Sequence, residues 1–182
     1  MSPRHIDLLA QLERYRPFDD FEARHREAIV ELVGSKPGAF ERGHFAPGHI
    51  TASCFIVDDD RLLLHHHRRL NRWLQMGGHV EGDEDPKDAA LREGSEESGL
   101  RDLTLAAGGI FDLDVHVIPA AKGEPKHRHF DVRYVARTAS PDAVVIDRAE
   151  SNDVAWVPLE RAEALMNEAA SSRVIQKIRS RL

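Results

Sequence analysis

The sequence has little cysteine: Cys54 is the single one among 182 residues, which excludes an internal disulfide. A lone cysteine is typical of a protein kept in a reducing compartment. Because Cys54 lies in the apolar run 50–57, we expect a small core residue and not a nucleophile. The first residues also lack the apolar core of a secretory signal, and the two absences together predict a cytoplasmic protein.

A long apolar run and a basic stripe are missing as well. Hydrophobic residues make up 41% of the chain, but no segment is long enough to cross a bilayer, which excludes a membrane-spanning protein. The net charge is −6 and the basic residues are dispersed, which argues against a long nucleic acid as partner. A small anionic ligand remains compatible with the sequence if a metal or local arginines offset the repulsion.

The chain length fits one domain with a modest extension. Residues 4–34 predict two helical segments that break near Pro17 and end at Gly34 and Pro37. We therefore divide the chain into an N-terminal helical extension, residues 1–45, and a main domain, residues 46–182. The helices of the extension could form the surface of a homodimer.

The main domain shows strand signals on both sides of one strong helix signal. A strand at 49–57, an acidic turn and a return strand at 61–67 predict a hairpin. Further strands are expected at 73–76, 102–118, 129–137 and 154–157. Helices are expected at 86–98, from about Pro158 to Glu168, and from about Ser171 to Arg181. This order indicates an α+β or mixed α/β/α layering.

Three glutamates share one face of the predicted helix 86–98. Glu93, Glu96 and Glu97 stand at relative positions i, i+3 and i+4, so their like charges repel one another. Mg²⁺ or Mn²⁺ would remove that penalty because these cations prefer carboxylate oxygens. The alternative is a solvated outer face, the usual reading of a glutamate cluster. The preceding Gly77 and Gly78, whose backbone can approach a ligand closely, favour a metal site.

The stretch 77–100 resembles the Nudix box, the pattern G-x5-E-x7-R-E-U-x-E-E-x-G-U in which U is aliphatic. The matching residues are Gly78, Glu84, Arg92, Glu93, Glu96, Glu97, Gly99 and Leu100. Gly94 departs from the pattern, and we expect it to let another element pack close to the helix. The segments GHITAS, WLQMGGHVEGDE, FDLDVHVIPA and HRHFDVRY are similar to an uncharacterised bacterial branch of this family.

The resemblance implies a fold and a reaction. The fold is of the α+β class, a Nudix-type α/β/α sandwich with a mixed β-sheet. The reaction is attack by water on a phosphorus of a nucleoside diphosphate linked to another moiety, with Mg²⁺ or Mn²⁺ as cofactor. The substrate is then a small molecule. The rival interpretation is a Nudix-fold sensor that holds a nucleotide or an ADP-ribose-type ligand without turnover; loss of box glutamates would indicate it, and every one is present.

The same resemblance gives roles to the residues of the box. Glu96 and Glu97 are the expected principal metal ligands, and the backbone carbonyl of Gly77 completes the shell. Glu93 is a third ligand or the base that deprotonates the attacking water, which makes Glu93 and Glu97 catalytic candidates together with Arg92.

A second set of residues has a supporting or an alternative role. Glu84 and Arg92 are expected to form a buried pair that fixes the loop against the helix and so orients the ligands. The base can also come from a later loop, where Glu150 and Asp153 are the candidates. The alternative for both acids is a solvated loop position.

Histidine is abundant, with eleven residues. The triplet 65–67 lies on a predicted strand whose neighbours alternate faces, so it cannot form one ligand set, and a structural role is expected. We expect four others to converge at the mouth of the pocket and donate hydrogen bonds to phosphate: His79, His116, His127 and His129. A transition-metal site built from these four is the alternative, although no spacing resembles a zinc pattern. Arg72 is a further candidate for phosphate contact, with an exposed loop as the alternative.

Overall fold

The computed structural model describes residues 1–121, 123–167 and 169–182. Its helices are α1 (Pro3–Arg14), α2 (Asp20–Ser35), α3 (Pro86–Ser98), α4 (Leu159–Met166) and α5 (Ala169–Arg181), with a short 3₁₀ turn at Pro141–Ala143. Its strands are β1 (Gly48–Asp58), β2 (Arg61–His67), β3 (Arg72–Leu74), β4 (Met76–His79), β5 (Thr104–Leu105), β6 (Asp112–Ile118), β7 (His127–Arg137) and β8 (Ser151–Pro158). In the described residues, no helix has the length and apolar character needed to cross a membrane.

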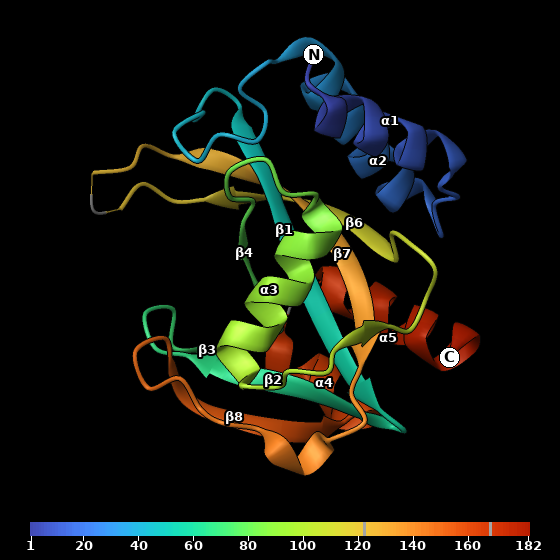
Figure 1. Cartoon of the computed structure of the whole chain (residues 1–182), viewed down its shortest axis with the longest axis vertical. Helices are drawn as coiled ribbons and strands as arrows, with labels where there is room; N and C mark the ends of the chain where they lie inside the picture. The colour runs from blue at the N-terminus through green and yellow to red at the C-terminus, as the bar shows by residue number, and fades with distance from the viewer. Residues whose placement is uncertain (122, 168) are drawn as a thin grey trace.

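The strands form one mixed sheet around β1. This strand pairs in parallel with β7 and antiparallel with β2 and β4. Strands β5 and β6 join the sheet through β7, whereas β3 and β8 join it through β2. Helix α3 crosses in front of β1, the pair α1 and α2 lies beside one end of the sheet, and α4 and α5 lie behind it (Figure 1). The α+β fold class with a mixed sheet between helices is therefore confirmed.

Helix α3 has the boundaries that its sequence predicts. Pro86 occupies the first turn, where it needs no hydrogen-bond partner for its nitrogen, and the side chain of Asp85 accepts the backbone N–H of Lys87. At the other end Gly99 adopts a φ of 77°, a left-handed conformation that glycine tolerates without a Cβ penalty. The helix that carries the glutamates is thus defined by local signals at both ends.

Two predicted strands are wrong because each is divided in the structure. The expected strand 73–76 belongs to two strands that meet at Gln75: β3 pairs with β2, whereas β4 pairs with β1. The expected run 102–118 is interrupted at 106–111, so only β5 and β6 pair with β7. At Gln75 the chain changes its partner strand, which leaves no mark in the local pattern, whereas the break at 106–111 separates two strands with the same partner and contains two glycines.

The terminal segments follow their predictions more closely. Helices α1 and α2 are separated by a stretch that contains Pro17, and β8 extends further in both directions than the expected 154–157. The predicted end of the following helix at Glu168 lies outside the described residues. The division of the chain near residue 45 and the use of α1 and α2 as a dimer surface stay predictions.

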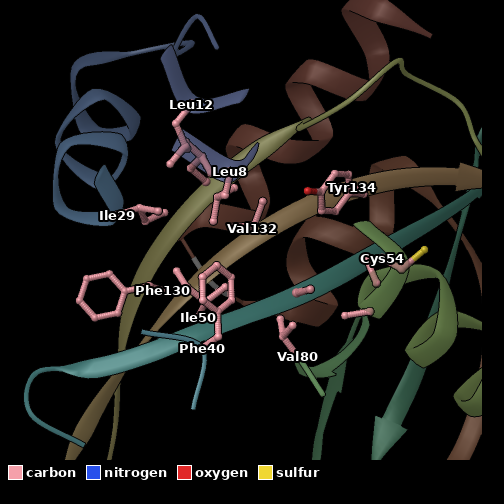
Figure 2. Close-up of a cluster of buried hydrophobic side chains, with 14 of the residues drawn as sticks. Leu8, Leu12, Ile29, Phe40, Ile50, Cys54, Val80, Phe130, Val132 and Tyr134 are labelled. Atoms are coloured by element: carbon pink, nitrogen blue, oxygen red, sulfur yellow. The ribbon is translucent and has the colours of Figure 1, made fainter. Parts of the chain in front are cut away.

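The hydrophobic core lies on both faces of β1. One cluster joins Leu8, Leu12 and Ile29 of the N-terminal helices to β1, β7 and α3 (Figure 2). The other cluster lies beneath α4 and α5 and includes Phe55 and Phe111. Because neighbouring strand residues alternate, Ile50, Ala52 and Cys54 face the first cluster. Ten of the eleven β1 residues are therefore buried, as expected for a strand covered on both faces.

A buried ion network ties α2, β6, β7 and α5 together. The guanidinium of Arg133 contacts the carboxylates of Asp112, Asp114 and Asp131. Asp112 also forms ion pairs with Arg173 and Lys177 of α5. The Nζ of Lys177 lies 2.6 Å from Oε1 of Glu22 on α2. All of these side chains are at most 7% exposed, so each charge depends on its partners. The network fixes β6 and β7 relative to the helices at that edge.

Gly94 lets α3 pack closely on the sheet, as the sequence predicts. A Cβ at this position would lie 3.0 Å from Leu103 Cδ1 and 3.1 Å from Cys54 Sγ. The thiol itself is completely buried, and burial, together with the nearby Glu97, raises its pKa to about 12. Cys54 is thus a small core residue and not a nucleophile.

Replacing Gly94 by leucine, the kind of residue that the box pattern expects, should destabilise the protein. We expect the free energy of unfolding to fall by about 1–3 kcal/mol because the side chain overpacks the contact with Cys54. Urea unfolding measures this value. In a Cys54→Ala background the loss should be smaller, and an equal loss in both backgrounds would contradict the packing role of Gly94.

Candidate active site

Glu97 is buried against the start of β4. Its carboxylate is 10% exposed, and its Oε2 accepts the backbone N–H of Gly77 at 2.8 Å. Burial raises the pKa of Glu97 to about 8; the Gly77 N–H opposes this shift, whereas repulsion from Glu93, Glu150 and Asp147 adds to it. Negative charge at Glu97 is therefore costly unless a cation lies nearby.

Arg92 connects the loop before α3 to the glutamates on the helix. Its Nη2 donates to Glu84 Oε1 at 2.8 Å and to the His79 carbonyl oxygen at 2.9 Å. Its Nη1 donates to Glu93 at 2.9 Å and to Glu96 at 3.2 Å. The side chains of Arg92 and Glu84 are 25% and 20% exposed, so this pair is half-buried and not buried as expected. The guanidinium thus holds three carboxylates and one strand carbonyl.

Two glycines allow close approach here, Gly78 to a carboxylate of α3 and Gly77 to the neighbouring strand β1. A Cβ on Gly78 would lie 2.4 Å from Glu93 Oε1, and a Cβ on Gly77 would lie 2.7 Å from the carbonyl oxygen of Ala52. Any other residue at Gly78 would displace Glu93. Steric room for Glu93 therefore explains the glycine of the box. Strand β4 carries no side chain at the point where this carboxylate approaches it.

The carboxylates of α3 differ in what they face. Glu93 and Glu96 both turn to Arg92, whereas Glu97 turns to Gly77. Burial raises the pKa of Glu93 although Arg92 opposes the shift. Glu96 is the exposed member, with 57% of its side chain accessible. Across the described ranges, no three of these glutamate oxygens lie within 4.8 Å of one another, so the glutamates are close to each other without forming a closed cage.

The two later acids differ in their relation to Glu97. Glu150 lies on the exposed turn before β8, near enough for its charge to raise the pKa of Glu97. Asp153 lies on β8 opposite His66, and its Oδ1 accepts the N–H of Val154. The structure therefore connects Glu150 to the glutamate site electrostatically and gives Asp153 a local backbone partner.

Sequence reasoning missed two neighbours of Glu97. His65, from the triplet read as structural, is buried with its Nδ1 3.8 Å from Glu97 and 2.8 Å from Ser151 Oγ. Burial lowers the pKa of His65 to about 4, so the ring is neutral at pH 7. Asp147 is the other, since its charge also raises the pKa of Glu97. The pairing of β2 with β8 brings both segments together, and no local pattern indicates that pairing.

The four predicted substrate histidines lie together, and His49 of β1 joins them. His49 is level with His129 on the neighbouring β7, and His129 is level with His116 on β6. The rings of His79, His127 and His129 lie 5.0–5.1 Å from that of His49. Because adjacent strand residues point to opposite faces, His79 projects from the face of β4 opposite to the one where Gly78 meets Glu93. Arg72 lies on β3 and donates to the carbonyl of Met166 at 3.2 Å.

Comparison with known proteins identifies relatives of this chain. The family model described as the NUDIX domain matches residues 47–178. A probable DHNTP pyrophosphohydrolase from Lactococcus lactis subsp. cremoris is 29% identical over 142 residues, which are 75% of this chain and 81% of that protein. A crystal structure of a NUDIX-family hydrolase from Clostridium perfringens has 28% identity and a TM-score of 0.56, and covers 72% of this chain and 97% of its own. A C. elegans Ap4A hydrolase, 23% identical, has the same fold with a TM-score of 0.58 over 72% of this chain and 95% of its own.

An Arg92→Lys variant should fold but be less stable. Lysine keeps the charge and loses the planar fork that reaches Glu84 and the His79 carbonyl together. We expect the free energy of unfolding to fall by about 1–3 kcal/mol, the range for losing hydrogen bonds to charged groups. Chemical denaturation checks this, with Arg101→Lys in the exposed bend after α3 as the control. Equal midpoints for the two variants would contradict the bridging role.

Proposed function

The chain belongs to the Nudix family of hydrolases, and from this premise we propose that it is a Mg²⁺-dependent enzyme that cleaves a phosphoanhydride bond. The substrate class is a nucleoside diphosphate linked to another moiety. The observation that carries the proposal is the placement of Glu93 and Glu97 of α3 against Gly78 and Gly77 of β4, with Glu96 beside them on the same helix and bonded to Arg92. A hydrolase of phosphoanhydrides needs cations at the substrate, and this placement supplies carboxylates for them.

The donor set suits a hard divalent cation. Carboxylate oxygens and a backbone carbonyl are the ligands that Mg²⁺ and Mn²⁺ prefer. The absence of a side chain at Gly78 lets the Glu93 carboxylate lie against β4, and the raised pKa of Glu97 reflects a charge that burial disfavours. Both features fit a site completed by a cation, with Glu96, Glu97 and the Gly77 carbonyl as its main ligands.

The chain's own residues position the reacting groups. When bound, the divalent cation neutralises phosphate charge, lowers the pKa of water and stabilises charge on the leaving oxygen. Arg92 donates to Glu93 and Glu96, so both carboxylates would have to turn from the guanidinium in order to hold the cation. Arg92 keeps its bonds to Glu84 and to the His79 carbonyl, and thereby keeps α3 in position.

The proton of the attacking water needs a base. Glu93, which can act as a third metal ligand or as this base, is our first candidate for the base because its side chain is mostly buried and its pKa is raised. Glu150 is the second candidate because its charge acts on Glu97, and Asp153 is the third. Separate Glu93→Gln and Glu150→Gln variants distinguish the first two by which one changes the pH profile of kcat.

The histidines on the sheet are proposed as further phosphate contacts, and His79 projects from the face of β4 opposite to the one that meets Glu93. His79, His116, His127 and His129 offer ring nitrogens next to one another, and neutral rings donate one hydrogen bond each. Arg72 is the proposed cationic contact on β3. The Lactococcus lactis relative, a probable DHNTP pyrophosphohydrolase, adds a pterin triphosphate to the candidates, beside nucleotide derivatives.

A substrate screen tests the proposed function. Phosphate release and product chromatography with Mg²⁺ or Mn²⁺ would cover ADP-ribose, NAD(H), dinucleoside polyphosphates, nucleotide sugars, nucleoside triphosphates and dihydroneopterin triphosphate. We expect turnover of at least one compound and a loss of at least about 100-fold in kcat in Glu97→Gln. Loss of a residue that only orients a metal ligand costs about 10–100-fold, so loss of a ligand itself should cost at least the upper value.

The matched control is Glu31→Gln, the same change on the exposed surface of α2, which should keep full activity. Removal of divalent cations by chelation should abolish turnover, and Mg²⁺ should restore it. Full activity of a folded Glu97→Gln would contradict the metal-ligand role, and binding of these compounds without any turnover would favour a sensor.

A further inference from the structure

Five histidine rings gather on one patch of the sheet, which we call the histidine cluster: His49, His79, His116, His127 and His129. They come from four strands, and the register makes His49, His129 and His116 level, whereas His79 lies opposite Thr51, two residues along β1 from His49. Three of them form a closed triangle, since the ring centroids of His49, His79 and His129 lie 5.0–5.4 Å apart. Such a set from β1, β4 and β7 exists only when the sheet is complete.

The triangle also brings ligand atoms together. One ring nitrogen from each of His49, His79 and His129 lies within 4.8 Å of the other two. Zinc binds histidine nitrogen at about 2.0–2.1 Å, so two nitrogens on one tetrahedral ion are about 3.4 Å apart. Small rotations of the rings about their side-chain torsions therefore bring the three nitrogens to coordination distance.

His49 is fixed in a form ready to bind a cation. Its Nδ1 lies 3.3 Å from the carbonyl oxygen of His44, which can only accept, so Nδ1 carries the proton and Nε2 presents a lone pair. The residue is 1% exposed, and among the described residues its Nε2 has no hydrogen-bond partner. A buried polar atom without a partner is destabilising, and a cation bound at Nε2 would remove that cost. Metal-binding histidines use the same arrangement, with the second nitrogen donating to a carbonyl.

The protonation state of the cluster agrees with this geometry. Burial lowers the pKa of His49, and it lowers that of His129 to about 2, with the neighbouring histidines contributing in the same direction. Neutral imidazole is the form that coordinates a metal, whereas a charged ring would be needed to attract phosphate by itself.

We propose that His49, His79 and His129 bind a transition-metal cation such as Zn²⁺, separate from the carboxylate site on α3. Imidazole nitrogen suits Zn²⁺, whereas Mg²⁺ prefers oxygen, so the two sites select different ions. Three histidines leave a fourth position open for water or a phosphate oxygen, as in catalytic zinc sites. The phosphate contact proposed for His79 and His129 would then pass through the ion.

Neighbouring residues support the three ligands. The ring of His127 stacks on that of His49 at 5.1 Å, and its Nδ1 is held by the carbonyl of Pro125 at 2.8 Å. His116 contacts His129 on the outer side and is tied to Asp114 at 3.0 Å. Both rings limit how far the ligands can turn, so they position the triangle without belonging to it.

Cobalt binding tests the proposal without any substrate, so its outcome does not depend on the proposed function. Tag-free protein, stripped of metal by chelation, would be titrated with Co²⁺ in excess Mg²⁺, which occupies carboxylate ligands and competes poorly for imidazole. We expect one Co²⁺ per chain, visible d–d absorption typical of nitrogen ligands, and displacement by Zn²⁺.

Variants locate the ion. His49→Gln, His79→Gln and His129→Gln should each weaken Co²⁺ binding at least about 100-fold, more than losing a group that only orients a ligand. His66→Gln on β2 is the matched control, and Glu96→Gln keeps the cobalt site intact. Circular dichroism checks folding, and if His49→Gln unfolds, the half-buried His79 and His129 variants decide the question.

Three outcomes would overturn the proposal. The first is that neither Co²⁺ nor Zn²⁺ binds in excess Mg²⁺, which would mean that the histidine cluster is no metal site. The second is binding that survives in both His79→Gln and His129→Gln. The third is binding lost in Glu96→Gln, which would place the ion on α3 and leave the proposed function unaffected.

Discussion

The close approach of α3 to the sheet is the contact on which the glutamate site depends. Gly94 lets the helix touch Cys54 of β1, and Gly78 lets the Glu93 carboxylate lie where a side chain on β4 would otherwise be. Without these two contacts the helix would stand further from the strand, and the N–H of Gly77 could not reach Glu97 at 2.8 Å. Steric room at two glycines thus determines where the acidic groups of the site can be.

This approach has an electrostatic cost that organises the rest of the site. It brings carboxylates together in a partly buried position, and burial and mutual repulsion raise the pKa of Glu97 and of Glu93. Arg92 offsets part of the repulsion through its bonds to Glu93 and Glu96. It does not bond to Glu97, whose carboxylate accepts the backbone N–H of Gly77, and this is the position where a cation would contribute most.

The sequence predicts what is local and misses what depends on distant strands. The helix 86–98 was predicted with its boundaries because Pro86 and Gly99 mark both ends, and the role of Gly94 followed from its departure from the box. The break at 106–111 contains Gly108 and Gly109, a local signal that could have indicated it. The divided strand at Gln75 is missed because a change of partner strand has no local signal. For the same reason His49 and His65 were not assigned to a site: their neighbours come from β7, β4 and β8, remote in the chain.

The central claim is that the carboxylates of α3 and the carbonyl of Gly77 bind a divalent cation. Anomalous diffraction from crystals grown with Mn²⁺ tests it most directly, because manganese scatters anomalously and binds the same oxygen ligands as Mg²⁺. The account predicts a peak bonded to Glu96, Glu97 and the Gly77 carbonyl, with Glu96 turned away from Arg92. Ordered crystals with no peak there, and with Glu96 still bonded to Arg92, would contradict it.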